Sequence, residues 1–143
     1  MTLNNLRELL EARAAAMPQK TWLFSATDNR RWNYAEFDAA VNRAANLLLS
    51  LGVGKGDKVS LLMANSPEYI FAYFACWKIG AVAGPVNSHL KSEELLYVLD
   101  NSEAVALITE RGFLDQVGPI RAGLRYLRDV ILTNAEVAGT INY

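Results

Sequence analysis

The side chains that could do chemistry gather in two polar loops, each of which follows a short apolar run. Asn65 and Ser66 follow the first run, and Asn87, Ser88 and His89 follow the second. Amide, hydroxyl and imidazole groups can bind a ligand, but we assign no general base, because a lone histidine in a loop is more often a polar surface residue than a ligand contact. We therefore assign no catalytic residue and treat Asn87, Ser88 and His89 as candidate binding residues. The alternative is that Asn87 only satisfies backbone groups of a turn and that His89 is a polar surface residue.

A glycine-rich segment that contains lysine, Gly52–Lys58, has the composition of a phosphate-binding loop. Such a loop follows a strand, precedes a helix and has the pattern G-x-x-x-x-G-K-[ST]. In this sequence a predicted helix precedes the segment, a predicted strand follows it, and neither Ser nor Thr follows the lysine. The segment is instead predicted to be a tight turn whose glycines take positive φ.

The single cysteine and the single histidine exclude a Cys/His zinc site, and we expect no metal site in this chain. Cys76 lies among apolar residues without a neighbouring histidine, which is typical of a buried structural thiol. One cysteine cannot form an intrachain disulfide, so a secreted disulfide scaffold is excluded and a reducing, cytoplasmic location is expected.

The amino-terminal part of the chain predicts a helix and a hairpin. Apolar residues recur at helical spacing over Leu3–Met17, Thr2 can cap this helix, and Pro18 ends it. The segments Thr21–Ala26 and Arg30–Trp32 flank turn residues and are predicted to pair as a β-hairpin.

Helices and strands are then predicted to alternate. Asn33 and Glu36 form a capping box at the start of a helix that ends at Gly52. The elements that follow are the strand Val59–Met63, the helix Pro67–Ile79, the strand Ala81–Val86, a helix from Ser92, the strand Ala104–Thr109, short helices near Phe113–Val117 and Pro119–Tyr126, and the strand Val130–Leu132.

This order predicts an α/β fold, a mostly parallel sheet flanked by helices, with an N-terminal helix and a β-hairpin. We expect residues 1–133 to form one α/β subdomain, and residues 134–143, which show no periodicity, to be a linker or a truncated end. The small residues of Ala81–Val86 predict a central strand, and we expect Leu61 and Val82 in the core. Ligands of such sheets bind at the carboxyl ends of the strands, where both polar loops fall.

Composition narrows the class of protein further. The 143 residues suit one domain, and 14 Lys and Arg against 15 Asp and Glu give a net charge of −1. The absence of a basic excess argues against nucleic acid as a partner, and the 52% hydrophobic content argues against disorder. The longest apolar run, Ile70–Trp77, is too short to span a membrane, and we expect neither a transmembrane segment nor a secretory signal.

Six segments, taken in order, carry a resemblance to a known family. They are Trp32–Phe37, Asn42–Leu48, Leu51–Val59, Asn65–Tyr69, Lys78–Val82, and Pro85–Asn87 with Ser92–Leu95. The series resembles the beginning of an AMP-forming acyl-CoA synthetase, a member of the adenylate-forming superfamily. The resemblance implies the N-terminal subdomain of a larger fold. It also implies a two-step ligase in which a fatty or aromatic acid and ATP give an acyl-adenylate and pyrophosphate, and CoA then displaces AMP.

The resemblance implies ATP, Mg²⁺ and CoA as the cofactors and co-substrates of the parent enzyme. In acyl-CoA synthetases the loop that corresponds to Gly84–His89 lies near the entrance used by the CoA nucleotide. The resemblance therefore assigns Asn87, Ser88 and His89 to the CoA side of the site. This sequence departs from the family's pattern at Ser88, where proline is common, and at His89, where arginine is common.

The family's Ser/Thr/Gly-rich phosphate loop, ribose-binding segment and catalytic lysine do not occur in these 143 residues and are expected beyond Tyr143. We therefore expect a fragment whose partner is the remainder of the parent enzyme. We expect it to be inactive alone, to bind none of ATP, Mg²⁺ and CoA tightly, and to self-associate through the face that the remainder covers. The alternatives are another adenylate-forming enzyme, such as an amino-acid adenylation domain or a luciferase-like enzyme, and a non-catalytic interaction module of the same fold.

Overall fold

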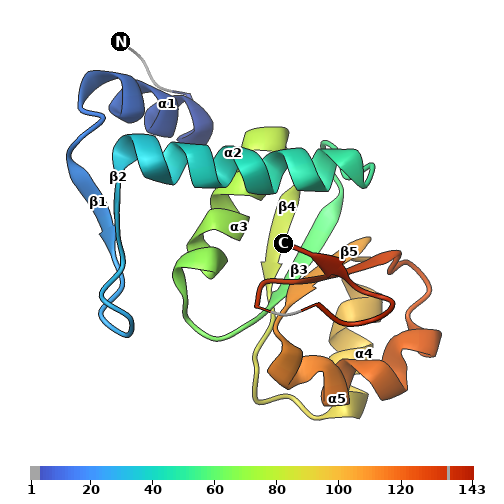
Figure 1. Ribbon diagram of the computed structural model, residues 1–143. Helices are drawn as coiled ribbons and strands as arrows, with labels where there is room; N and C mark the ends of the chain where they lie inside the picture. The colour runs from blue at the N-terminus through green and yellow to red at the C-terminus, as the bar shows by residue number, and fades with distance from the viewer. Residues whose placement is uncertain (1–3, 135) are drawn as a thin grey trace.

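A five-stranded parallel sheet forms the centre of the computed structural model, which describes residues 4–134 and 136–143 (Figure 1). Its strands are β3 (Lys58–Leu62), β4 (Val82–Pro85), β5 (Ala106–Thr109), β6 (Asp129–Leu132) and β7 (Ile141–Asn142). They lie in the order β4-β3-β5-β6-β7, and every neighbouring pair is parallel. This arrangement confirms the predicted α/β class with a mostly parallel sheet.

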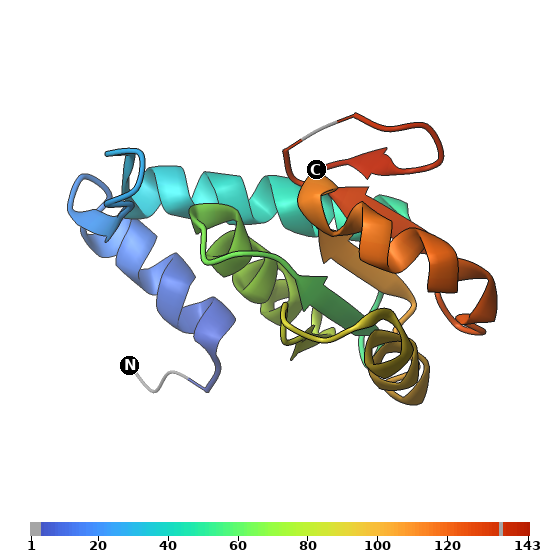
Figure 2. The ribbon, with the colours of Figure 1, turned by 90° about the horizontal axis from the view of Figure 1, so that it is seen from below.

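Helices cover both faces of this sheet (Figure 2). On one face lie α2 (Tyr34–Ser50) and α3 (Pro67–Ile79). On the other face lie α4 (Ser92–Asn101), α5 (Leu114–Val117) and the 3₁₀ segments Arg111–Phe113 and Gly118–Gly123. Crossover helices on opposite faces make this a doubly wound sheet.

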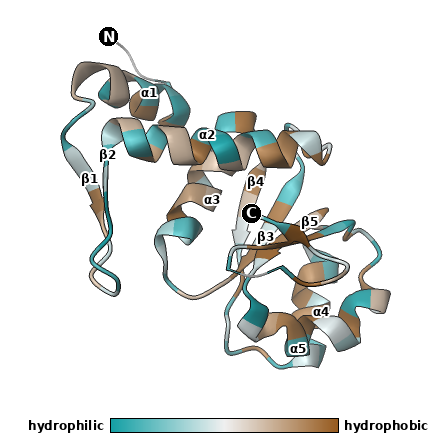
Figure 3. Cartoon of the chain, in the orientation of Figure 1, coloured by the Kyte–Doolittle hydropathy of each residue, from teal (hydrophilic) through white to brown (hydrophobic). Residues whose placement is uncertain are grey.

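Strands β3 and β5 are buried because their side chains enter two different cores. Val59, Leu61 and Ile108 pack with α2 and α3, whereas Leu62 and Leu107 pack with α4 and α5. These five side chains are fully buried, and the hydrophobic parts of β3 and β5 are brown in Figure 3. A strand that is buried on both faces shows no polar alternation, as the sequence of β3 predicts.

The amino-terminal helix α1 (Leu6–Ala16) and the hairpin of β1 (Thr21–Phe24) and β2 (Arg31–Asn33) form a second assembly, which we call the α1–hairpin unit. It packs against the first turns of α2 and against α3 through Leu10, Phe37, Val41 and Phe71. The predicted hairpin is confirmed.

The caps of α1 and α2 show how local sequence sets helix starts. At α2 the predicted capping box is present, with the Glu36 amide donating to Asn33 Oδ1 at 2.8 Å and the Asn33 amide donating to Glu36 Oε2 at 2.9 Å. At α1 the cap is Asn5, whose Oδ1 accepts from the Glu8 amide at 2.9 Å. The predicted cap, Thr2, lies outside the described residues. Helix α1 begins at Leu6, too far along the chain for Thr2 to cap it.

A buried lysine joins α1 to the two helices beneath it. The side chain of Lys78, at the end of α3, is only 7% exposed. Its Nζ donates to Asp38 Oδ1 at 2.6 Å and to Asn42 Oδ1 at 2.7 Å, both on α2. Glu11 Oε1 of α1 lies 3.5 Å from the same Nζ. The charge of Lys78 thus links three helices.

The prediction that Ala81–Val86 forms a central strand is wrong. Strand β4 lies at one edge of the sheet, and the Val82 side chain, expected in the core, is 52% exposed. The cause is the strand order, because β5 pairs on the opposite side of β3 and leaves β4 with one neighbour. The amides of Val82 and Val86 donate to carbonyls of the β3 segment, so the backbone N–H and C=O groups at Ala83 and Pro85 alternate to the side away from β3.

The carboxyl-terminal segment holds a strand that the sequence pattern did not predict. In β7, Ile141 pairs with Ile131 and Asn142 with Leu132, and the Tyr143 amide donates to the Leu132 carbonyl at 2.8 Å. A two-residue strand is too short to show a period in sequence. Within the described residues, no helix is both long enough and apolar enough to cross a lipid bilayer.

Candidate binding site at the carboxyl ends of the strands

The strand order places the topological switch point between β3 and β5. The connection from β3 leads to β4 on one side, and the connection from β5 leads to β6 on the other side. Loops that follow two such strands diverge and leave a crevice at their carboxyl ends, where doubly wound proteins bind ligands. The predicted loop Ala64–Ser66 follows β3 and borders this point. Glu110 borders it from β5.

Polar groups at the switch point tie the strand ends to one another. Thr109 Oγ1, which is buried, donates to the Leu62 carbonyl at 2.6 Å. Glu110 interacts with the Ala64 backbone, and burial raises the pKa of its carboxyl group above the ordinary value, with repulsion from Glu68 acting in the same direction. This end of the sheet therefore carries a cross-strand hydrogen bond and a partly desolvated carboxyl group.

Sequence reasoning missed Glu110. Its signal is a carboxylate placed directly after a buried strand, at Thr109-Glu110, but one carboxylate after one strand does not indicate which neighbouring loop it meets. That information depends on β5 pairing with β3, which is a long-range contact.

The second predicted loop, Asn87, Ser88 and His89, follows the edge strand β4 and lies one strand away from the switch point. Asn87 Oδ1 accepts from the His89 amide at 3.0 Å, and the Leu90 amide donates to the Asn87 carbonyl at 3.3 Å. The three residues are thus brought together in one turn of the Asx type. Asn87 and His89 are exposed, and Ser88 is half-buried. The backbone role of Asn87 is present, and its side-chain amide N–H groups are not used in that turn.

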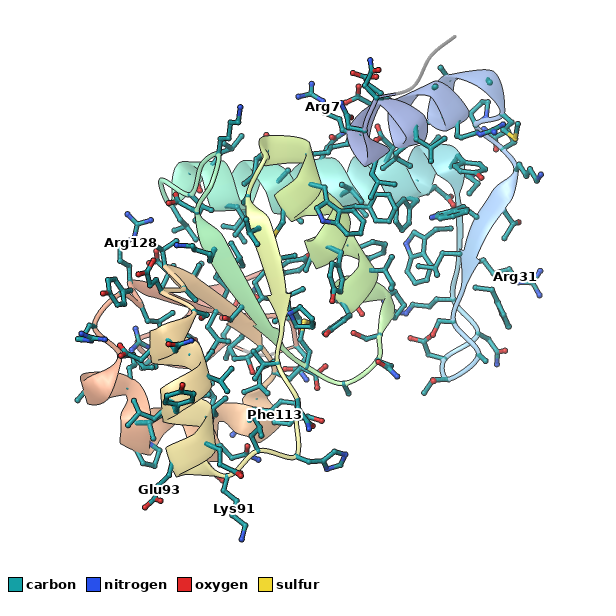
Figure 4. All side chains as sticks on the ribbon, turned by 180° about the vertical axis from the view of Figure 1, so that it is seen from behind. Arg7, Arg31, Lys91, Glu93, Phe113 and Arg128 are labelled. Atoms are coloured by element: carbon teal, nitrogen blue, oxygen red, sulfur yellow. The ribbon has the colours of Figure 1, made fainter. Side chains whose placement is uncertain are left out.

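The loop leads into α4, whose first residues are charged. Lys91 and Glu93 extend away from the helix start, and Phe113 lies nearby (Figure 4). The Lys91 amide donates to Glu94 Oε2 at 2.9 Å, which closes the first turn. The Asn87 turn is therefore followed along the chain by one lysine and two glutamates at the beginning of α4.

The loop after β3 is occupied with structural hydrogen bonds. Ser66 caps α3 by accepting from the Tyr69 amide at 3.3 Å. Glu68, in the first turn of α3, binds the Arg30 guanidinium at 2.8 and 3.3 Å. Arg30 also binds Asp28, and these hydrogen bonds, the one from Glu68 first, raise the pKa of Arg30 further above its ordinary value. This cluster fastens the hairpin loop to the start of α3.

The glycine-rich segment is a turn, as predicted, and lies at the opposite end of the sheet, before β3 begins. Gly52 and Gly56 have φ of +75° and +88°, a region that favours glycine. The Gly54 amide donates to Asp57 Oδ2 at 2.9 Å. Lys55 packs its side chain under Gly80, with Cγ 3.1 Å from where a Cβ would stand. The segment therefore fixes the approach of α3 to the turn.

Nucleophilic and metal chemistry have little support in this part of the protein. Cys76 is fully buried, and burial raises the pKa of its thiol to about 12, so the thiolate that reacts is disfavoured. Among the described residues, no three His, Cys, Asp or Glu side chains are grouped so that they could hold a metal ion. No residue of this chain is therefore assigned to Mg²⁺.

A pocket of about 370 Å³ with both charged and apolar walls lies between β2, α2, α3 and the end of β7. Arg30, Arg43, Glu68 and Trp32 line it together with Tyr143. The Tyr143 hydroxyl is buried without a hydrogen-bond partner among the described residues, and burial raises the pKa of this phenol. The pocket can hold polar groups by hydrogen bonds and charge, which is a binding role.

Comparisons with known proteins agree over most of the chain. Residues 10–139 match the family described as AMP-binding enzyme. The crotonobetaine/carnitine–CoA ligase of Escherichia fergusonii is 36% identical over 137 residues, which are 93% of this chain and 26% of that protein. The same-named ligase of Salmonella typhimurium is 39% identical over 120 residues, or 82% of this chain and 23% of that protein. The chain thus spans about a quarter of these curated relatives.

Solved structures give the same result for the fold. The anthranilate CoA ligase AuaEII in complex with anthranoyl-AMP superposes with a TM-score of 0.84 at 31% identity, covering 91% of this chain and 25% of that one. The N-terminal domain of FACL13 from Mycobacterium tuberculosis superposes with a TM-score of 0.85 at 31% identity, covering 93% of this chain and 34% of that one. By its matched residues and by its doubly wound sheet, the chain belongs to the family of AMP-binding enzymes, whose relatives here are CoA ligases.

Proposed function

We propose that this chain is the amino-terminal part of an ATP-dependent ligase that converts a carboxylic acid into its CoA thioester with release of AMP. The observation that carries the proposal is the match of residues 10–139 to the AMP-binding family, together with 36% identity to a CoA ligase along 93% of the chain. We place this ligase in the cytoplasm because the single cysteine of this chain is free and buried, which is typical of a protein in a reducing compartment.

The proposed reaction proceeds by two displacements. A carboxylate oxygen of the acid attacks the α-phosphorus of ATP, and pyrophosphate leaves. The CoA sulfur then attacks the acyl carbon of the adenylate, and AMP leaves with the electron pair of the broken C–O bond. Adenylation is needed because AMP is a far better leaving group than the oxide that a free carboxylate would have to expel.

In this proposal, the described residues shape the binding site and none of them reacts with the substrates. The switch point of the sheet is braced by Thr109 and Glu110, and the Asn87 turn stands one strand away. The proposal therefore includes the expectation that the isolated chain is inactive and that the remainder of the parent ligase is its partner.

On the same proposal, the turn of Asn87, Ser88 and His89 lies on the CoA side. The free amide N–H groups of Asn87, the Ser88 hydroxyl and a His89 ring N–H can donate hydrogen bonds to phosphate or carbonyl oxygens of CoA. These groups bind and position CoA, and they take no part in bond making.

The experiment that tests the function uses the full-length ligase and the isolated chain side by side. Crotonobetaine, carnitine, anthranilate and a fatty acid are offered with ATP, Mg²⁺ and CoA, and acyl-CoA and pyrophosphate are measured. We expect the full-length protein to form acyl-CoA from at least one acid and the isolated chain to release no pyrophosphate above a protein-free control. Pyrophosphate release by the isolated chain would contradict its inactivity, and formation of an adenylate without any thioester would contradict the ligase proposal.

The CoA-side turn is tested in the same full-length protein. We expect Asn87→Ala and His89→Ala to raise the KM for CoA about three- to tenfold, the effect of one lost hydrogen bond, while pyrophosphate release in the first step stays near wild type. Ser102→Ala, a hydroxyl change at the far end of α4, is the matched control and should leave both steps unchanged. If both half-reactions fall together in Asn87→Ala, the turn is structural only.

A further inference from the structure

An apolar pocket of about 240 Å³ lies in the α1–hairpin unit, away from the carboxyl ends of the strands. It is formed where α1 crosses over β1, the beginning of α2 and the second half of α3. Its lining is Leu9, Leu10, Arg13, Trp22, Tyr34 and Phe74.

The walls of this pocket are aromatic rings held by one another. Trp22 stacks on Tyr34 with ring centroids 5.2 Å apart and an interplanar angle of 22°. Phe37 stands behind them, edge-on to Trp22 at 6.0 Å and to Phe74 at 5.2 Å. The contacts among these rings keep the pocket open in this structure.

The free faces of the rings make the pocket an apolar surface open to water. Trp22 is 45% exposed although it stacks on a neighbour. A ring that enters the pocket would cover part of this surface, which is favourable by the hydrophobic effect, and would gain face or edge contacts with three aromatic side chains. The volume suits one ring, since a cavity of about 150 Å³ is known to accept benzene.

Arg13 supplies a positive charge at the mouth of the pocket. It stands in the last turn of α1 and is exposed. Among the described residues no carboxylate lies within ion-pair distance of Arg13, whereas Arg7 on the same helix is bound to Glu11 at 3.0 Å. A free guanidinium above an aromatic pocket is complementary to a planar carboxylate that carries an apolar body.

We propose that this pocket binds a small carboxylate with an aromatic ring or a short apolar chain, its ring between Trp22, Tyr34 and Phe74 and its carboxylate on Arg13. The inference goes beyond the proposed ligase function and does not depend on it, since it needs no ATP, no CoA and no turnover. A ligand of this size in an open pocket binds with millimolar affinity.

The test is a titration of the isotope-labelled chain with benzoate, followed by NMR at the indole N–H of Trp22. We expect saturable shifts at millimolar benzoate, while the indole N–H of Trp32, which does not line the pocket, stays in place. Benzamide keeps the ring and loses the charge, and acetate keeps the charge and loses the ring. Both are expected to bind at least threefold more weakly than benzoate.

The variant Arg13→Gln separates charge from shape. We expect it to weaken benzoate binding about three- to tenfold and to leave benzamide binding unchanged. Arg7→Gln removes the same charge from the same helix outside the pocket and should bind benzoate as the wild type does. A dispersed spectrum identical outside α1 shows that both variants are folded.

Several outcomes would overturn the proposal. They are the absence of any shift at Trp22, equal binding of benzoate and benzamide, equal weakening by Arg7→Gln and Arg13→Gln, and shifts at Trp22 with anionic lipid vesicles but not with benzoate. The last result would assign the exposed rings to a membrane surface instead.

Discussion

The parallel sheet and the α1–hairpin unit both bury apolar side chains, but they use different kinds. The sheet is filled by aliphatic residues such as Leu61, Leu107 and Ile108, which interdigitate from both faces and are fully buried. The α1–hairpin unit is filled by rings, and a charged lysine holds its helix in place. Aromatic pairs prefer offset-stacked or edge-to-face arrangements, and such pairs surround the pocket of about 240 Å³ in the second region.

The largest expected effect of a single substitution is in the sheet. Leu61→Ala removes a fully buried side chain between α2 and α3, and we expect the free energy of unfolding to fall by about 2–5 kcal/mol. Val82→Ala on the edge strand, where the side chain is 52% exposed, is the matched control and should cost about 0.5 kcal/mol or less. Urea unfolding measures both, and equal losses would show that the edge strand is covered.

A smaller effect is expected where charge holds the α1–hairpin unit. Lys78→Met removes the ammonium group that meets Asp38, Asn42 and Glu11, and leaves Asp38 half-buried with one partner fewer. We expect a loss of about 1–3 kcal/mol in the free energy of unfolding, together with faster amide exchange in α1 than in β3. Arg7→Gln, which breaks an exposed pair, should cost under about 0.5 kcal/mol. If Lys78→Met is neutral, packing alone holds α1.

The smallest expected effects are those of pH, and they have opposite signs in the two regions. In the hairpin loop, the Ser25 hydroxyl and then Arg30 lower the pKa of Asp28 below 3.8. The ionised Asp28 therefore stabilises the folded state above that pH, and this stabilisation is lost as the pH falls through the lowered pKa. At the sheet, burial raises the pKa of Glu110 above 4.5, so its charged form destabilises the folded state and this cost disappears on acidification.

Two variants measure this difference by urea unfolding between neutral pH and about pH 3. Asp28→Asn is expected to be less stable than the wild type at neutral pH, and Glu110→Gln more stable. Both differences from the wild type should shrink as the pH falls. The difference of Asp28→Asn should shrink only below pH 3.8, the ordinary pKa of that carboxyl group, whereas the difference of Glu110→Gln should have shrunk by the time the pH reaches 4.5. A difference of the same sign in the two variants would contradict the assignment.

Features that depend on near neighbours in the chain could be predicted from the sequence. The capping box of Asn33 and Glu36, the glycine turn before β3 and the helix start at Pro67 each involve residues only a few positions apart. Residue types at such spacing fix the backbone locally, whatever the rest of the fold does. The alternation of strands and helices then restricts the class to a parallel sheet.

Features that depend on strand order could not be predicted in the same way. The sequence of β4 contains only small and apolar residues and reads as buried, yet the pairing of β5 with β3 leaves it at an edge. The meeting of Glu110 with the loop after β3, and the short strand β7, arise from the same long-range pairing. For the candidate site, both polar loops were found from sequence, but their unequal distance from the switch point was not.

The outward position of Pro85 affects the chain while it is being synthesised. β3 and β4 leave the ribosome before β5, so a half-made sheet is open to strands of neighbouring nascent chains on the same messenger RNA. Along its outer side, β4 presents the amide of Ala83 and then, at Pro85, no amide at all. A foreign strand can form only an interrupted ladder there. The missing amide of Pro85 thus disfavours strand addition at this edge.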